Sequence, residues 1–504
     1  MNIPKILTTL EPIWLNGEIV NTYPLSFLII FFRIKFYKIK RFIKNLALFI
    51  GLLTFTFSQE IPNEFLEFQS QEILYDAGEM WESHTLLGPI RFQDLKNYDS
   101  ELRDDSNSLN IKLMGGLHLL NEAMALYGFG HFTYQKYFYA YLYPRIVNNP
   151  KKFMRYSGIP RDIPRRSFNS GETDISGIGF QNNWLNFQFG RGRESWGAGN
   201  KIQLALSENS PAYDYGSLRL NFGKLRVKYI HGFLESTENS TNRYITARGI
   251  EWTNQESFIM GISETVIYSG LNRPFDIGYF NPISTHLEIE LNNRLNMQGT
   301  SDANAVWTVS LDWLIKQRLR ISGNYLYDEF VLDPDLEINK EHGKAYSLKT
   351  VFSLIKTNFM LLNIYSSLIH VGTPTFRHGS GFNNFVVRNK PLGWQYGSDG
   401  EQINFGFNYF NRKDLIARVE IVQRKIGQES ISSRPYDSYF DYLKGEFPSG
   451  TIDKTSSFIS EIQWWFRPNI SLIGNVELKK QTKRETEIAV ILGFDIFLPK
   501  FFNI

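Results

Sequence analysis

The chain contains no cysteine among its 504 residues, so it forms neither a disulfide scaffold nor a thiolate metal site. Its mean hydropathy of -0.27 is far below that of a protein built from many membrane-spanning helices. Aromatic residues, in contrast, are abundant: 41 Phe, 26 Tyr and 10 Trp make up 15% of the chain, which excludes a disordered polar protein. These features are typical of a folded, aromatic-rich chain such as a closed β architecture, which can run long as a single unit.

The N-terminal region has the features of an export signal. Six lysines and arginines lie within residues 33–44, and an uncharged apolar run follows at 46–57. Thr56 and Ser58 place small residues at the two positions that a signal peptidase reads, so we expect residues 1–58 to be an extension plus a signal peptide that is cleaved after Ser58. The apolar stretch 24–32 leaves open an earlier signal or a membrane helix, although it is only about half the ~20 residues that a span requires.

The net charge gives no argument for nucleic-acid binding. The whole chain carries +3, but removal of 1–58 leaves about −2, because seven basic and only two acidic residues lie in that region.

From about residue 175 to the end, apolar and polar residues alternate with a period of two. In 218–229, Gly223-Lys224 joins two alternating runs, which predicts a hairpin with a two-residue turn. The same pattern recurs in 307–327, 403–421 and 458–478, and a last strand is expected at 488–498. No helical period separates these hairpins.

Such alternation fits either a soluble antiparallel sandwich or propeller, or a transmembrane barrel whose apolar face meets lipid. Two features favour the barrel. Aromatic residues lie at strand ends beside short turns, namely Trp313, Tyr409, Trp464, Trp465 and Phe466. Long polar connections alternate with the short turns, at 145–174, 328–344, 371–400 and 426–455.

We therefore predict an all-β fold: an antiparallel transmembrane β-barrel of about 16–18 strands over 111–504, located in the outer membrane. Residues 59–110 are polar and acidic, with a short amphipathic helix around 62–79. They are expected to form a periplasmic or plug segment, or alternatively a disordered lead-in.

A glycine-rich stretch at 189–200 stands out as a candidate site. Arg191, Arg193, Glu194 and Trp196 combine bidentate donors, an acceptor and an aromatic surface, a set that can bind sugars. A nucleotide loop is disfavoured, because antiparallel strands surround the stretch where a dinucleotide site needs a parallel strand and a helix. The alternative is a glycine-rich strand end that packs inside the lumen.

A second candidate site is the basic loop 145–166. It contains a single acid and seven basic residues, which are Arg145, Lys151, Lys152, Arg155, Arg161, Arg165 and Arg166. If this loop faces outward, anionic polysaccharide and lipopolysaccharide phosphates are its available partners, with Arg161, Arg165 and Arg166 as the proposed contacts. The alternatives are a solvated loop and a set of charges folded into the pore.

Catalytic signals are weak. His378 and Ser380 are the nearest pair of base and nucleophile, but no orienting Asp or Asn can be assigned from sequence. The remaining histidines lack metal-ligand spacing on one strand. We expect no enzyme activity, no cofactor and no metal.

An ordered set of motifs over roughly 185–400 resembles the capsule-assembly outer-membrane lectins of the Wzi type, in the form found in Bacteroidetes-like bacteria. The motifs are Phe189-Gly190-Arg191, Trp196 to Gly199, Leu204 to Pro211, His231-Gly232, Ile262 to Glu264 through Tyr268, Tyr279 to Pro282, Asp302, Asp328 with Asp333, Pro391 to Gly393, and Gly397 to Gly400. Asp399, in the last of these, completes our candidate set for glycan binding.

The resemblance implies an eighteen-stranded barrel with a periplasmic helical element. It also implies that the protein binds exported capsular or exopolysaccharide and helps to hold it on the cell surface, without catalysis. The expected partners are this polymer, outer-membrane lipid and lipopolysaccharide, and the expected state is a monomer. A diffusion channel with a charged lumen is the alternative, and an outer-membrane hydrolase is the third.

Overall fold

The computed structural model describes residues 14–15, 18–19, 66–81, 84–88, 109–135, 137–153, 155–161, 168–292, 294, 303–328, 341–439, 445–482 and 484–503. The chain divides into two compact units, 1–55 and 56–504. In the first, β1 (Trp14–Leu15) pairs antiparallel with β2 (Glu18–Ile19). The predicted apolar run and the cleavage position at Ser58 lie outside the described residues.

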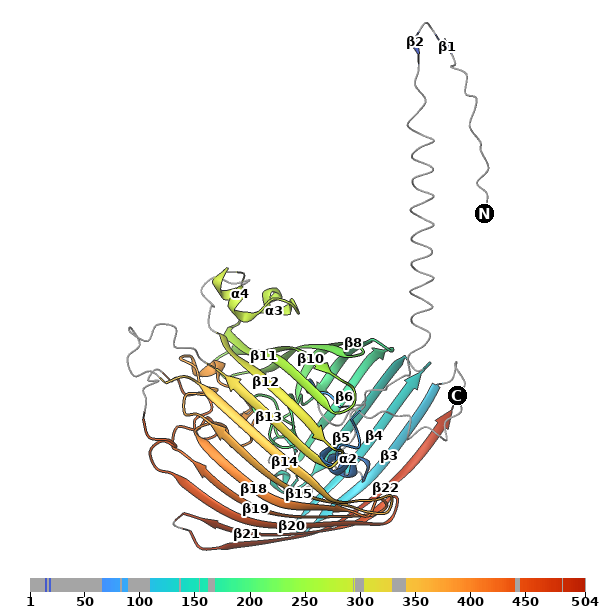
Figure 1. Ribbon diagram of the computed structural model, residues 1–504, viewed down its shortest axis with the longest axis vertical. Coiled ribbons are helices and arrows are strands. Elements are labelled where there is room, and N and C mark those ends of the chain that lie inside the picture. Colours follow the sequence, from blue (N-terminus) through green and yellow to red (C-terminus); the bar gives the residue numbers. More distant parts are fainter. Residues whose placement is uncertain are drawn as a thin grey trace. The chain divides into compact units, whose positions relative to one another are not determined.

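The second unit is a closed antiparallel barrel of eighteen strands (Figure 1). These are β3 (Leu109–Leu120), β4 (Ala123–Tyr134), β5 (Phe138–Val147), β6 (Ser170–Gln181), β7 (Leu185–Gly192), β8 (Tyr213–Phe222), β9 (Leu225–Ser236), β10 (Thr241–Thr253), β11 (Phe258–Leu271), β12 (Ala303–Ile315), β13 (Leu319–Tyr327), β14 (Lys344–Lys356), β15 (Leu361–Val371), β18 (Gly400–Phe410), β19 (Leu415–Ile426), β20 (Asp453–Arg467), β21 (Ile470–Gln481) and β22 (Glu487–Asn503).

Each barrel strand pairs with its neighbours in the chain, and β22 pairs with β3 to close the ring, with Gly493 opposite Leu120. Closure leaves no open sheet edge, so every strand can satisfy its backbone groups within the barrel. The predicted all-β antiparallel barrel is confirmed, and its strand count is eighteen.

The strands turn polar residues inward and apolar residues outward. On β12, Asp312 and Ser310 are buried, while Val309, Leu311 and Trp313 are exposed. A soluble sheet would bury the apolar face, so this inverted alternation fits a barrel that is surrounded by lipid. The soluble sandwich and propeller alternatives are therefore wrong.

The two ends of the barrel differ. One end, the short-turn end, carries the connections 135–137, 182–184, 223–224, 254–257, 316–318, 357–360, 411–414 and 468–469 together with both barrel termini. The other, the loop end, carries the long connections 148–169, 193–212, 272–302, 328–343, 372–399 and 427–452. This asymmetry is typical of outer-membrane barrels, in which short turns are periplasmic and long loops are extracellular.

Aromatic residues form the predicted belt beside the short turns, with one difference. Trp252, Trp313 and Trp464 are exposed on the outer wall near that end. Trp465, which we expected in the belt, is instead buried and packs inside the barrel against Ile73. Because side chains alternate, only every second residue of a strand can face lipid.

Inside the barrel, three segments far apart in sequence meet. The first is the plug segment, residues 66–81 and 84–88, which begins with α2 (Leu66–Asp76). The second and third are the loops 193–212 and 372–399, which carry the short pair β16 (Val386–Val387) and β17 (Lys390–Pro391). The two loops touch where Trp394 donates its backbone N–H to the Leu204 carbonyl oxygen at 3.1 Å.

Glycine permits this contact. A Cβ atom on Gly393 would lie 1.7 Å from the carbonyl oxygen of Leu204, so any larger residue would push the two loops apart.

The other helical elements within the described residues are short. They are η2 (Pro150–Lys152), α3 (Ile277–Phe280), α4 (His286–Leu291) and η3 (Gly381–Asn383). Among the described residues, no helix has both the length and the apolar character to cross a membrane.

Candidate functional site

A groove of about 1030 Å³ opens at the loop end of the barrel. It is lined by residues from five segments, around 150–160, 211, 235–239, 382–390 and 436. Its lining includes the aromatic residues Tyr156, Phe382 and Tyr436, the acids Glu235 and Glu238, and the bases Lys151, Arg388 and Lys390.

Arg243 of β10 fixes the loop 372–399 to this groove. Its guanidinium is fully buried and donates three hydrogen bonds to backbone carbonyl oxygens: Nε to Phe382 at 2.6 Å, Nη2 to Asn384 at 2.7 Å and Nη1 to Val386 at 2.8 Å. It also pairs with the carboxylate of Glu235. The arginine side chain suits this site because its planar, permanently charged guanidinium can donate hydrogen bonds to several acceptors at once.

Glu235 in turn joins the other walls of the groove. Its Oε1 accepts from the Tyr436 hydroxyl at 2.8 Å, and its Oε2 accepts from the backbone N–H of Arg388 at 3.0 Å. The Arg388 side chain reaches across to the carbonyl oxygens of Ser157, at 3.3 Å, and Ala212. The floor of the groove is thus held in place before any ligand binds, which lowers the entropic cost of binding.

The groove offers chemistry suited to a sugar polymer. Lys151, Lys390 and Glu238 are exposed at its rim, where they can reach a ligand. The half-buried Phe382 and Tyr436 give flat apolar surfaces for sugar rings, whereas Tyr156 is buried beneath the groove. Lysines can bind carboxylate or phosphate groups. Pockets for small molecules span roughly 300–1,000 Å³, so the groove can hold more than one sugar unit.

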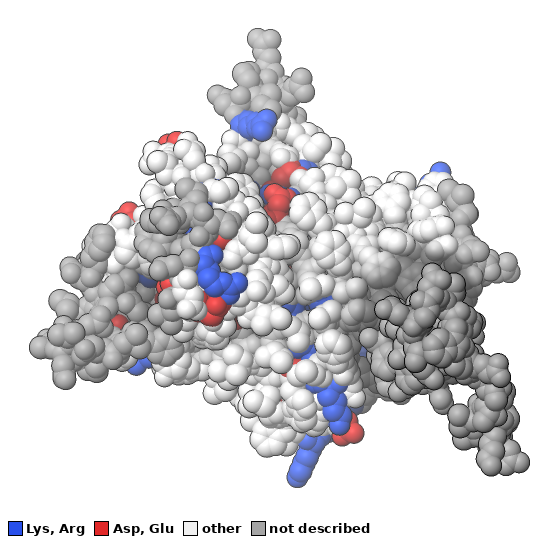
Figure 2. Space-filling model, turned by 90° about the horizontal axis from the view of Figure 1, so that it is seen from above, with Lys and Arg blue, Asp and Glu red and all other residues white. Residues whose placement is uncertain are grey.

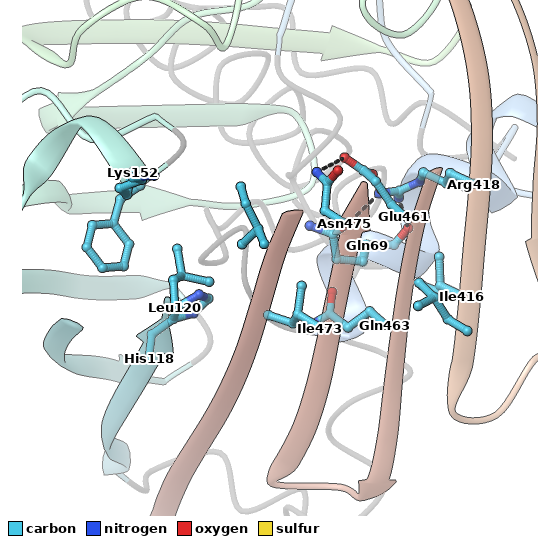
Figure 3. A pocket seen from close by; sticks show the side chains of 13 residues that line it. Gln69, His118, Leu120, Lys152, Ile416, Arg418, Glu461, Gln463, Ile473 and Asn475 are labelled. Carbon is cyan, nitrogen blue, oxygen red and sulfur yellow. Dashed lines mark hydrogen bonds and ion pairs between the residues drawn. The ribbon is translucent and has the colours of Figure 1, made fainter. Parts of the chain in front are cut away.

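A second, smaller space of about 150 Å³ lies in the lumen beside α2 (Figure 3). Arg418 of β19 points toward α2 there and donates to Gln69 Oε1 at 2.7 Å, while Asn475 donates to Glu461 Oε1 at 3.3 Å. This cavity is below the usual size of a small-molecule pocket. Within the described residues, it does not provide a route for a polymer.

Ion pairs hold α2 to the wall. Asp76 accepts from Lys349 Nζ at 2.8 Å, and Glu72 lies 3.2 Å from Arg418 and 3.7 Å from Arg155. Burial alone would raise the pKa of Glu72, but the surrounding cations Lys201, Arg418, Arg155 and Lys349 lower it to about 2. Glu72 is therefore a pH-sensitive anchor of the plug segment.

The docking of α2 should weaken in acid. Because the pKa of Glu72 falls from 4.5 to about 2 on folding, its contribution is complete above pH 4.5 and is lost as the pH falls toward 2. That contribution is on the order of 3 kcal/mol. The protection factors of the amides in 69–76, which are corrected for the intrinsic pH dependence of exchange, should fall over this range. Glu72→Gln should show low protection already at pH 7 and lose most of the pH dependence. If the protection of residues 69–76 in Glu72→Gln still falls with pH as in wild type, carboxylates other than Glu72 cause the acid dependence.

The glycine-rich candidates mostly lie inside the barrel and bond to the protein. Arg193 donates to Asp174 Oδ1 at 2.5 Å and to the Ser210 carbonyl oxygen at 2.7 Å. Glu194 accepts from Lys228 Nζ at 2.6 Å and from Trp196 Nε1 at 2.7 Å. All three candidates are buried. These contacts favour a role in fixing the loop 193–212, and their binding of glycan stays a prediction.

Arg191 is separated from this group. It continues the outward row of Phe187 and Phe189 on β7 and pairs with Asp214 at 3.2 Å. Asp399 is fully buried and joins two loops, because it accepts from Thr373 Oγ1 at 2.8 Å and from the backbone N–H of Ser449 at 2.9 Å.

The basic loop divides between the lumen and the surface. Arg145 is buried and pairs with Asp174 at 2.9 Å, whereas Arg161 is exposed next to Pro160 at the groove. Arg165 and Arg166 lie outside the described residues. Of the predicted charges, Lys151 lines the groove itself.

Sequence reasoning did not find Tyr156, Phe382 and Tyr436 as groove residues. They come from three loops that are far apart in the chain, so no local spacing links them. The sequence did indicate that all three lie in long connections, which were expected to face outward.

The contact described between His378 and Ser380 is not the one that a catalytic base makes with the hydroxyl of its nucleophile. The backbone N–H of Ser380 donates to His378 Nδ1 at 3.0 Å, which occupies that ring nitrogen. Among the described residues, no group of three His, Asp or Glu side chains is placed to hold a metal ion.

No family model and no curated protein sequence matches the chain. Among solved structures, it is similar to Wzi of Escherichia coli, an outer-membrane protein involved in group 1 capsule assembly that is described as a carbohydrate-binding β-barrel. The TM-score is 0.52 at 10% identity over 77% of this chain and 84% of that one.

Pseudomonas aeruginosa OccK9 (TM-score 0.42, 10% identity, 78% and 98% coverage) and OpdK with vanillate (0.41, 9%, 78% and 98%) are less similar. The likeness to Wzi establishes a shared fold, that of an outer-membrane β-barrel.

Proposed function

We propose that the protein binds an exported acidic polysaccharide, capsular or exopolysaccharide, in the groove at its loop end and helps to attach it to the cell surface. The observation that carries this proposal is the groove itself, which is preorganised, lined by aromatic rings and rimmed by lysines. The shared fold with a carbohydrate-binding barrel supports it. The proposal places the barrel in the outer membrane and assigns it no catalytic step.

Substitution of the two rim lysines tests the proposal. Lys151→Ala together with Lys390→Ala should weaken binding of a polymer rich in carboxylates about tenfold, because two exposed cations that face the ligand are lost. The binding isotherm of the purified protein in detergent measures this. The matched control is Lys224→Ala, an exposed lysine in the turn 223–224 at the other end, which should leave binding unchanged.

Equal binding by wild type and the double variant would show that the polymer does not bind at the rim of the groove. An equal loss in Lys224→Ala would show that the polymer responds to net charge only.

A diffusion channel is the second candidate, since a barrel of this type can enclose an aqueous pore. The plug segment and two loops that meet in the lumen argue against it. In planar bilayers, we expect the wild-type protein to conduct far less than an open porin of similar strand number. A steady porin-like conductance would favour the channel.

A further inference from the structure

The connection between β11 and β12 does not line the groove. Its described part, residues 272–292 with α3 and α4, folds back onto the outside of the barrel wall, and we call it the outer flap. Tyr279 of the flap is fully buried and stacks on Tyr268 of β11, with ring centroids 4.5 Å apart. Tyr268 faces outward, because it shares its side of β11 with the exposed residues Met260 and Ile262.

The flap covers polar groups that would otherwise face lipid. Arg248 and Glu264 occupy outward positions on β10 and β11 and form an ion pair at 3.2 Å. Glu264 Oε1 also accepts from the backbone N–H of His286 in α4 at 3.0 Å. Charges that face hydrocarbon are costly, so the covering segment has to remain on the wall.

The opposite face of the flap is apolar. Its large exposed apolar side chains are Phe275, Ile277, Phe280, Ile283 and Leu287, of which Ile283 is 85% exposed. The ion pair of Glu288 with Arg294 lies at one end of the flap. In Figure 1, α3 and α4 lie above the ends of β11 and β12, and in Figure 2, which is seen from above, the described Lys, Arg, Asp and Glu residues form only small separate patches.

This apolar face continues the lipid-facing wall. Ile250 and Ile262, the next outward pair on β10 and β11 toward the short turns, are exposed apolar residues. Glu264 pairs in register with Trp307, which pairs with Tyr327. Outward aromatic residues at this height are typical of the membrane–water interface.

We propose that the outer flap is seated at the membrane–water interface of the outer leaflet, where its exposed apolar side chains contact the boundary between the lipid headgroups and the acyl chains. It is then a membrane-anchoring surface of the loop region and takes no part in the groove. The proposal rests on the barrel spanning a bilayer and is independent of what the groove binds.

The cysteine-free sequence allows a direct test. A nitroxide is attached to single cysteines in the full protein reconstituted in phospholipid vesicles, and its collisions with oxygen, which enriches in lipid, and with a water-soluble nickel chelate are measured. Ile283→Cys should favour oxygen over nickel severalfold, as should the wall control Ile262→Cys. Ile159→Cys, at an exposed isoleucine of the groove, should show the reverse.

Two results at Ile283 would overturn the proposal. Greater access to nickel, as at Ile159, would place the flap in water. Shielding from both reagents would mean that another protein surface, such as a second copy of the chain, covers it. If the nitroxide at Ile262→Cys is also more accessible to nickel than to oxygen, this wall does not face a bilayer. That result is distinct from one in which only Ile283→Cys is accessible to nickel, which contradicts the flap proposal alone.

Discussion

Replacing Arg320 with alanine is expected to release the plug segment from the barrel wall. The buried guanidinium donates to both carboxylate oxygens of Asp312, at 2.8 and 2.5 Å, and lies 3.6 Å from the ring centre of Tyr75. Asp312 also contacts the Tyr75 hydroxyl at 3.3 Å and His84 at 3.0 Å. Loss of the arginine leaves a fully buried carboxylate without its main partner, which costs roughly 3–5 kcal/mol.

The measurement is hydrogen exchange of the amides in 66–81, which should quicken about 100-fold or more if this cost falls on plug docking. Arg318→Ala is the matched control, because Arg318 is exposed on the turn 316–318 only two positions away. It should change exchange less than twofold. A double variant, Arg320→Met with Asp312→Leu, removes both charges and should retain more protection than Arg320→Ala. Unchanged protection in Arg320→Ala would contradict the anchoring role of this ion pair.

Replacing Arg243 with methionine is expected to reduce polysaccharide binding more than tenfold. Methionine fills a similar volume but cannot donate to the three carbonyl oxygens of residues 382–386, and hydrogen bonds to charged groups contribute about 1.5–3 kcal/mol each. Glu235 also loses its buried cation, so the contacts that join Tyr436 and Arg388 should loosen. The binding isotherm reports the functional loss, and faster proteolysis within 382–390 reports the structural one.

Arg467→Ala is the comparison, since Arg467 is an exposed arginine at the short-turn end of β20. It should leave both readouts unchanged. If Arg243→Met loosens residues 382–390 and binding stays at the wild-type level, the polymer binds elsewhere on the molecule.

The barrel could be predicted because its determinants are local. The alternation in 307–327 fixes both the hairpin of β12 with β13 and the face that each residue takes, since period two and a short turn are readable from a few neighbours. The inward fold of the loop 193–212 is not local. Arg193 and Glu194 form ion pairs with Asp174 and Lys228, which belong to other strands, so spacing alone could not separate an internal role from a glycan site.

The sequence carries a signal for the outer flap that lies in the exceptions to the period-two alternation. Arg248 and Glu264 interrupt outward rows that otherwise contain Ile250, Trp252, Met260 and Ile262. A charge in a lipid-facing row implies a cover. Which segment supplies the cover depends on tertiary contacts, and the residues 272–292 that do so follow β11 directly.

The most direct test of the proposed attachment role is to delete the gene in its host and measure the polysaccharide that stays on the cells against that shed into the medium. Complementation with wild type and with the Lys151→Ala, Lys390→Ala variant provides the comparison. We expect the total amount of polymer to stay constant and to shift to the medium in the deletion strain and in the lysine variant, with wild type restoring retention. An unchanged distribution in the deletion strain, with slower uptake of small solutes, would contradict polysaccharide attachment and favour the channel.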